Sequence, residues 1–270
     1  MKTRIEKTTL PIHSLLPACL FALLVPDIAR AERIPGQLFD NFPQRAWLES
    51  YDPTLISSRF FSEFIYESYD NDTDVFKIEN TLRWGIPLNS DVAFGFQVMV
   101  PTKWVETADD DAFGIGDLEA RAGVVGHISS CLRYGVGVNA VMDTASDDLL
   151  GDDAFVLRPT IAIRWDVTNR VTIGTNVEYN VTPWDEGNSD VSALELKFPV
   201  VFKISDTWSA FASYNPRWNY LDESDRQRLE LSTTWMWGPE KQYALTLGTE
   251  VPLDSESFEY KLAAGFHWYF

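Results

Sequence analysis

Residues 75–86 read VFKIENTLRWGI, and from Phe76 onward an apolar residue stands at nearly every second position. The positions between them hold polar residues such as Lys77, Glu79 and Arg83. Successive side chains of a β-strand point to opposite faces of a sheet, so this alternation predicts a strand with one apolar and one polar face. The spacing of an amphipathic helix does not fit the segment.

The same alternation recurs along most of the chain. Twelve segments show it, at residues 58–69, 75–86, 92–104, 115–128, 132–143, 154–166, 170–182, 191–204, 208–220, 227–238, 243–253 and 258–270. Strands of globular sheets are most often ~5–6 residues long, and most of these segments are about twice that length. A strand tilted by ~45° crosses a bilayer core with ~9–11 residues, so the segments are long enough to span one.

The connectors between the segments alternate in kind. Those after the odd-numbered segments are expected to be long loops, at residues 70–74, 106–112, 143–153, 184–190, 221–225 and 254–257. These six contain 20 of the 40 acidic residues and no Lys or Arg. Turns after the even-numbered segments are short. An even number of strands with long loops on one side predicts an all-β fold, a transmembrane antiparallel up-and-down β-barrel of about 12 strands in the cell outer membrane.

Such a barrel must close, because each unpaired backbone group in lipid costs several kcal/mol. Strand 58–69 is therefore expected to pair with strand 258–270. Tryptophans of the apolar parity lie near strand ends, as an interfacial girdle requires; they are Trp84, Trp104, Trp165, Trp208, Trp235, Trp237 and Trp268. A soluble β-sandwich is the alternative, but its connectors have no reason to alternate between long and short.

The N-terminus has the layout of a secretory signal peptide over residues 1–31, with a basic start, an apolar stretch and a small-x-small site at residues 29–31. A lipoprotein signal ending at Cys19 is the rival interpretation. Residues 32–57 show no alternation and predict a periplasmic extension or a partial plug. Cleavage after residue 31 leaves Cys131 as the one cysteine, so the mature chain cannot form an internal disulfide.

Composition excludes several classes of function. A formal charge of −18 repels phosphate backbones, so no nucleic-acid partner is expected. No metal-ligand spacing, nucleotide loop or redox pair is present, so no metal and no cofactor is predicted. Acidic runs such as residues 109–111 and 147–148 are interpreted as solvated, with binding of divalent cations that bridge to lipopolysaccharide as the alternative. The expected surroundings are outer-membrane lipid and lipopolysaccharide.

If the apolar parity faces lipid, the polar parity lines the lumen. The candidate lumen-lining residues are Lys77, Arg83, Asp117, Glu119, Arg121, Arg133, Arg158, Arg164, Glu178, Arg228 and Glu230. One interpretation is a narrow aqueous path whose charges select solutes, and the other is a filled, salt-bridged interior. The many arginines favour anionic or aromatic-acid solutes, because a planar guanidinium suits carboxylate or phenolate oxygens. The acidic loops favour the opposite selectivity, because they would repel anions at the entrance.

His127 and Ser129 are the candidates for a catalytic pair. His127 has lumen parity, Ser129 falls at a turn, and Asn139 also faces inward, so no oriented base activates a nucleophile. No catalytic residues and no enzymatic activity are predicted.

Residues 113–121 read FGIGDLEAR, and the preceding strand ends in Val98-Met99-Val100-Pro101-Thr102. These motifs resemble the meta-pathway phenol-degradation family of outer-membrane barrels, over about residues 86–270. The resemblance implies an outer-membrane channel or transporter for aromatic or hydrophobic compounds. The terminal Phe270 resembles the signal by which the barrel assembly machinery recognises outer-membrane proteins.

The sequence thus predicts an outer-membrane channel for passive uptake of small-molecule solutes, with aromatic or anionic solutes favoured. A sealed structural barrel without transport is the alternative, and an outer-membrane hydrolase ranks third.

Overall fold

A computed structural model of the chain describes residues 57–183, 190–221, 224–238, 241–254 and 258–270. The strands are β1 (Arg59–Tyr69), β2 (Thr73–Pro87), β3 (Val92–Glu106), β4 (Asp111–Ile115), β5 (Glu119–His127), β6 (Leu132–Val141), β7 (Val156–Asp166), β8 (Val171–Val181), β9 (Ser192–Lys203), β10 (Trp208–Asn219), β11 (Asp225–Trp237), β12 (Tyr243–Pro252) and β13 (Phe258–Tyr269). One short 3₁₀ turn, η3 (Asp148–Leu150), lies between β6 and β7. The expected signal peptide and all but residue 57 of the extension 32–57 lie outside the described residues.

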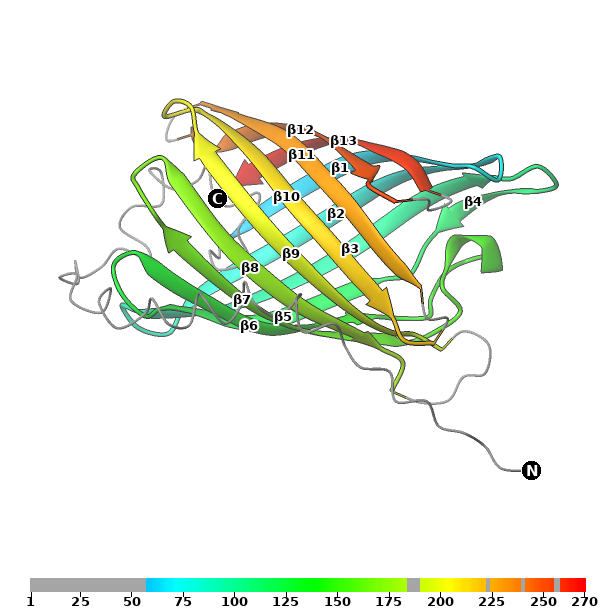
Figure 1. Ribbon diagram of the computed structural model, residues 1–270, viewed down its shortest axis with the longest axis horizontal. Coiled ribbons are helices and arrows are strands. Elements are labelled where there is room, and N and C mark those ends of the chain that lie inside the picture. The colour runs from blue at the N-terminus through cyan, green and yellow to red at the C-terminus, as the bar shows by residue number, and fades with distance from the viewer. Residues whose placement is uncertain (1–56, 184–189, 222–223, 239–240, 255–257) are drawn as a thin grey trace.

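The strands form one closed antiparallel barrel, seen from the side in Figure 1. Apart from β4, each strand pairs with the next strand of the barrel along the chain, and β1 pairs with β13 from Arg59↔Tyr269 to Tyr69↔Phe258. The expected closure of the first strand on the last is confirmed. Twelve strands make the ring, because β4 pairs only with the end of β3 while β5 continues the circle.

The predicted strand 115–128 is wrong at its beginning. The chain leaves the sheet at Gly116, Asp117 and Leu118, which separate β4 from β5. Gly116 donates its backbone N–H to the carbonyl of Pro101 at 3.0 Å, so the break stays attached to β3. A kink at this position fits glycine, which adds no side chain to a bend in a strand.

The prediction of long loops at one rim is confirmed only in part. The β6–β7 connector (residues 142–155) and the β8–β9 connector (residues 182–191) are long. In segments 70–74 and 106–112 only the short turns at residues 70–72 and 107–110 lie outside the strands, because Asp74 pairs with Glu106 and Glu106 with Asp111 in extended hairpins. The β1–β2 and β3–β4 hairpins project beyond the neighbouring strands (Figure 1).

The outer face of the barrel is apolar. Phe64, Val136, Ile161, Leu247 and Phe266 expose between 41% and 60% of their surface although the chain buries other hydrophobic side chains. Tryptophans extend this face near the strand ends, where their exposed fractions lie between 41% and 62%; they are Trp84, Trp104, Trp208, Trp235, Trp237 and Trp268. An apolar belt with aromatic borders on a closed barrel is the surface that a bilayer requires.

No helix among the described residues is long and apolar enough to cross a membrane. We refer to the rim that carries residue 57 and Phe270 as the chain-end rim, and to the opposite rim, with the 142–155 loop, as the loop rim.

Candidate functional site on the inner wall of the barrel

Side chains of the polar parity come together on the inner wall. Within each strand they alternate with the exposed apolar side chains, as Ala162, 2% exposed, does between Ile161 at 55% and Ile163 at 38%. Closure of the barrel brings together inward residues that lie far apart in the sequence. The candidate site is therefore this wall rather than a pocket between domains.

A row of arginines runs across half of the wall. Cross-strand register aligns one inward side chain from each of β1, β2, β3, β5, β6 and β7. In that order they are Arg59, Arg83, Gln97, Arg121, Asn139 and Arg158. Four cations and two neutral amides share the row, with no carboxylate among them. We call these six residues the arginine row.

The first two arginines of the row are held by neighbours. Arg59 is 2% exposed and lies over the rings of Phe61 and Tyr269, at 4.8 and 5.7 Å from their centroids. Arg83 donates from Nε and Nη2 to Gln97 Oε1 at 2.9 and 2.7 Å. Fixed guanidinium groups of this kind stay charged and keep their orientation.

Toward the loop rim, cations and carboxylates are paired. Lys77 Nζ lies 2.7 Å from Glu67 Oε2, and Arg228 Nη1 lies 3.1 Å from Glu250 Oε1. Arg158 Nη1 is 3.6 Å from Glu119 Oε1, whose second oxygen accepts a hydrogen bond from Asn139 at 2.7 Å. Mixed charges on this part of the wall therefore offset one another.

Two further predicted carboxylates accept neutral hydrogen bonds. Thr160 donates to Glu178 Oε2 at 3.1 Å, and Asn215 Nδ2 donates to Glu230 Oε2 at 3.3 Å. Both groups therefore keep acceptor capacity beyond these contacts.

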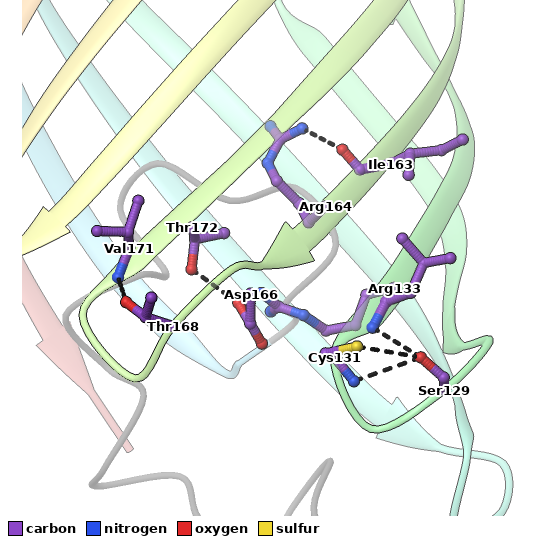
Figure 2. A network of polar contacts seen from close by, with 10 residues as sticks. Ser129, Cys131, Arg133, Ile163, Arg164, Asp166, Thr168, Val171 and Thr172 are labelled. Carbon is purple, nitrogen blue, oxygen red and sulfur yellow. Dashed lines mark hydrogen bonds and ion pairs between the residues drawn. The ribbon is translucent and has the colours of Figure 1, made fainter. Parts of the chain in front are cut away.

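Near the chain-end rim, two predicted arginines are almost fully covered (Figure 2). Arg133 is 0% exposed, and its Nη2 lies 2.9 Å from Asp166 Oδ1, which also accepts from the Thr172 hydroxyl at 2.7 Å. Arg164, 1% exposed, donates to the carbonyl oxygens of Ile163 and Thr175 at 2.9 and 3.2 Å. Such buried, bonded groups offer almost no surface to a solute.

Asp117 has a different surrounding from the other predicted residues. It is 4% exposed, and Oδ1 accepts from the backbone N–H groups of Thr144 and Ala145, each at 3.0 Å. Oδ2 accepts from the backbone N–H of Asp152 at 2.8 Å. One carboxylate thus binds both arms of the 142–155 loop.

The 142–155 loop packs on the inner face of the long hairpins. Leu150, 0% exposed, forms an apolar cluster with Val75, Val105 and Ala112. Lys103 Nζ donates to the Leu150 carbonyl at 2.7 Å. The residues of β2, β3 and β4 in this cluster alternate with the outward residues Phe76, Trp104 and Phe113. The loop therefore covers the inner side of the hairpins at the loop rim.

The loop concentrates negative charge at this rim. Desolvation, followed by the nearby carboxylates of Asp148 and Asp143, raises the pKa of Asp153 above its usual range. Asp153 also has a φ of 50°, in the left-handed region that Asp tolerates better than most residues.

Strand parity places Gln97 and Asn139 on the inner wall, but it does not give their partners Arg83 and Glu119. Sequence reasoning missed two contributors, Arg59 and Lys103. The partner of Lys103, the Leu150 carbonyl, lies 47 residues away in the sequence.

Ser129 takes part in a turn at the chain-end rim (Figure 2). Its Oγ accepts from the backbone N–H groups of Cys131 and Leu132 at 3.4 and 3.2 Å. These contacts fix the turn between β5 and β6. They do not activate the hydroxyl as a nucleophile, because a hydroxyl that accepts bonds is not deprotonated by them.

No protein-family model matches the chain, and no curated protein matches it by sequence. Solved barrels do match. The COG4313 outer membrane channel from Pseudomonas putida F1 is 12% identical, with a TM-score of 0.67 over 80% of this chain and 96% of that chain. The NanC porin is 9% identical, with a TM-score of 0.56 over 77% of this chain and 98% of the porin.

The CymD monoaromatic hydrocarbon channel is 7% identical, with a TM-score of 0.53 over 83% of this chain and 93% of the channel. At these identities the likeness concerns the fold, and the fold is that of outer-membrane channels and porins. Together with the apolar belt, it identifies the protein as an outer-membrane β-barrel.

Proposed function

We propose that the protein is an outer-membrane channel for passive movement of small solutes, with anionic or aromatic solutes favoured. The observation that carries this proposal is the arginine row on the inner wall of a closed barrel. A barrel that served only as an envelope anchor would have no need of an inward cation such as Arg121, which has no ion-pair partner among the described residues. Charges on the lumen wall are what tune solute selection in such barrels.

Two other observations support the proposal. The 142–155 loop packs against the inner side of the hairpins at one rim, through Leu150 and its bond from Lys103. One of the barrels that match by fold is described as a monoaromatic hydrocarbon channel, CymD. The motif at residues 113–121 adds a resemblance to the meta-pathway phenol-degradation family, whose implied solutes are also aromatic or hydrophobic.

Enzymatic activity is not part of the proposal, since the Ser129 hydroxyl is engaged in its turn. Ester hydrolysis by the folded barrel that disappears in a Ser129→Ala variant would overturn this point.

The direct test is electrical. The mature chain, refolded and inserted into a planar bilayer, is expected to give discrete current steps. Absence of steps at every salt concentration, from a sample shown to be folded, would instead support a sealed structural barrel.

We further propose that lipopolysaccharide surrounds the loop rim and that the barrel assembly machinery recognises Phe270. The Phe270 ring is 55% exposed beside Trp268, at 5.5 Å between centroids, and its backbone N–H bonds to Ser58 at 3.2 Å. Deletion of Phe270 is expected to lower the amount of barrel in outer-membrane fractions; an unchanged amount would contradict this role.

A further inference from the structure

A cavity lies on the inner wall where β2, β3, β5, β6 and β7 run side by side. The two flanking strands border it through Arg83 on one side and through Thr160 and Ala162 on the other. The polar side chains of the lining, Arg83, Gln97, Arg121 and Thr160, all have the inward parity, so the cavity faces the barrel interior. Outward residues of the same strands also border it; they are Phe96, Ala122, Val124, Val136 and Val138.

Arg121 contributes an uncompensated cation to this cavity. Its side chain is half-buried, and in the part of the chain that the structure describes its guanidinium has no hydrogen-bond or ion-pair partner. Its two neighbours in the register form hydrogen bonds with other residues: Gln97 accepts from Arg83, and Asn139 donates to Glu119. The five N–H donors of Arg121 thus remain available to a ligand.

A cation that has lost part of its hydration without gaining a protein partner favours an anion beside it. The guanidinium is planar and presents two parallel donors, which match the two oxygens of a carboxylate. Arg83, oriented by Gln97 at the same edge of the cavity, adds positive potential there. This edge of the cavity is therefore an anion-binding edge.

The floor of the cavity carries no side chains. Gly95, Gly123 and Gly137 lie in register on three adjacent strands. Neither Gly123 nor Gly137 tolerates a Cβ, which would come within 2.8 Å of the carbonyl oxygens of Val136 and Ala122, respectively. Packing between the strands requires these glycines, and the consequence is a flat floor of backbone atoms.

The floor continues into small apolar side chains, since Val125 and Ala162 also line the cavity. Small-molecule sites are typically apolar surfaces with a few placed polar groups. Here the polar groups lie at one edge and the flat apolar surface extends from them. A planar ring with one carboxylate matches both parts at once.

We propose that Arg121 and the glycine floor form a binding site for small aromatic carboxylates, with Arg121 binding the carboxylate and the ring lying on Gly95, Gly123 and Gly137. This rests on the proposed channel function and names a solute class for it.

The test is equilibrium binding of benzoate to the full mature barrel in detergent, followed by titration calorimetry, after heat-dependent gel mobility has shown each variant to be folded. Wild type is expected to bind benzoate, and Arg121→Gln is expected to weaken it by about tenfold or more, the usual effect of losing a charge-assisted pair. Arg121→Lys should fall between them, because an ammonium keeps the charge but not the fork.

The matched control is Arg170→Gln, which removes the same charge from an exposed turn at the chain-end rim. Its benzoate affinity is expected to equal that of wild type. Equal weakening by Arg170→Gln and Arg121→Gln would overturn the site, since net charge alone would then explain the binding.

Two further ligands test the shape of the site. Acetate lacks the ring and is expected to bind about tenfold more weakly than benzoate, because it buries little apolar surface. Cyclohexanecarboxylate has the charge and a puckered ring, and it should also bind more weakly. Equal affinities for all three anions would overturn the role of the flat floor.

The binding site and the channel function can be disproved independently of each other. A barrel that conducts ions but binds no benzoate keeps the channel function and loses the site. A barrel that binds benzoate through Arg121 but gives no current keeps the site and loses the channel.

Discussion

The carboxylate of Asp117 holds together a loop whose bonded residues lie 27 to 35 positions further along the chain. Asp117→Ala removes the acceptor for three backbone N–H groups, and hydrogen bonds to a charged group contribute about 1.5–3 kcal/mol each. We expect the variant to destabilise the 142–155 loop by about 2–4 kcal/mol, because the losses are not additive. The measurement is the rate of proteolytic cleavage within the loop of the folded barrel.

Channel current provides a second readout of the same variant. A loosened loop should increase the current noise and the mean conductance at the loop rim. Asp143→Asn, an exposed residue of the same loop, is the control and should leave both unchanged. Cleavage and conductance equal to wild type in Asp117→Ala would show that Asp117 does not hold the loop.

Asp153 gives this loop a dependence on pH. Its pKa is raised in the folded state, so the folded loop binds a proton more readily than the unfolded one, and this group favours the folded loop increasingly as pH falls through its folded pKa. Asp153→Asn, which fits the positive φ, should therefore slow loop cleavage at neutral pH and have little effect near about pH 4. Slowing of equal size at both pH values would contradict the raised pKa.

At the scale of strands, the alternation of faces predicts that the introduction of an arginine costs more stability on the outer face than on the inner face. Val136→Arg places a charge on the lipid side in the middle of β6, where Val136 is 51% exposed, and should destabilise the barrel by about 2–4 kcal/mol. Ser232→Arg places the same charge on the inner side of β11 and should cost under about 1 kcal/mol. Urea-dependent folding into vesicles measures both, and equal costs would mean that the two faces do not differ in solvent.

Strands and faces were predictable from the sequence because alternation needs only neighbouring residues. A period of two gives the face of a residue such as Arg133, but not that Asp166, on another strand, is its partner. The break at Gly116 carried a signal in its glycine, whereas the role of Asp117 depends on loop residues that reach it only in the folded barrel. The sequence analysis interprets acidic runs as loops because charged side chains favour solvent. Asp74 and Glu106 are nevertheless paired in the β2–β3 ladder.

For the molecule as a whole, the proposed channel function has two charged regions acting in series on an anion. The arginine row would attract the anion inside the barrel, and the acidic loop rim would repel it at the entrance. Exposed charges are screened more strongly by salt than partly buried ones, and the Debye length falls from ~30 Å at 0.01 M to ~3 Å at 1 M. Reversal potentials measured across fixed salt gradients should therefore shift toward anion selectivity as the mean concentration rises. A shift toward cations would contradict this arrangement.

The central claim is that the apolar outer face contacts the hydrocarbon of a bilayer. Fluorescence quenching by brominated lipids tests it most directly, because Trp84, Trp208, Trp235 and Trp268 lie exposed on that face. In vesicles of brominated lipid we predict strong quenching of the tryptophan emission compared with unbrominated vesicles. Equal emission in the two lipids, from a chain that stays a folded monomer in buffer without detergent, would contradict it.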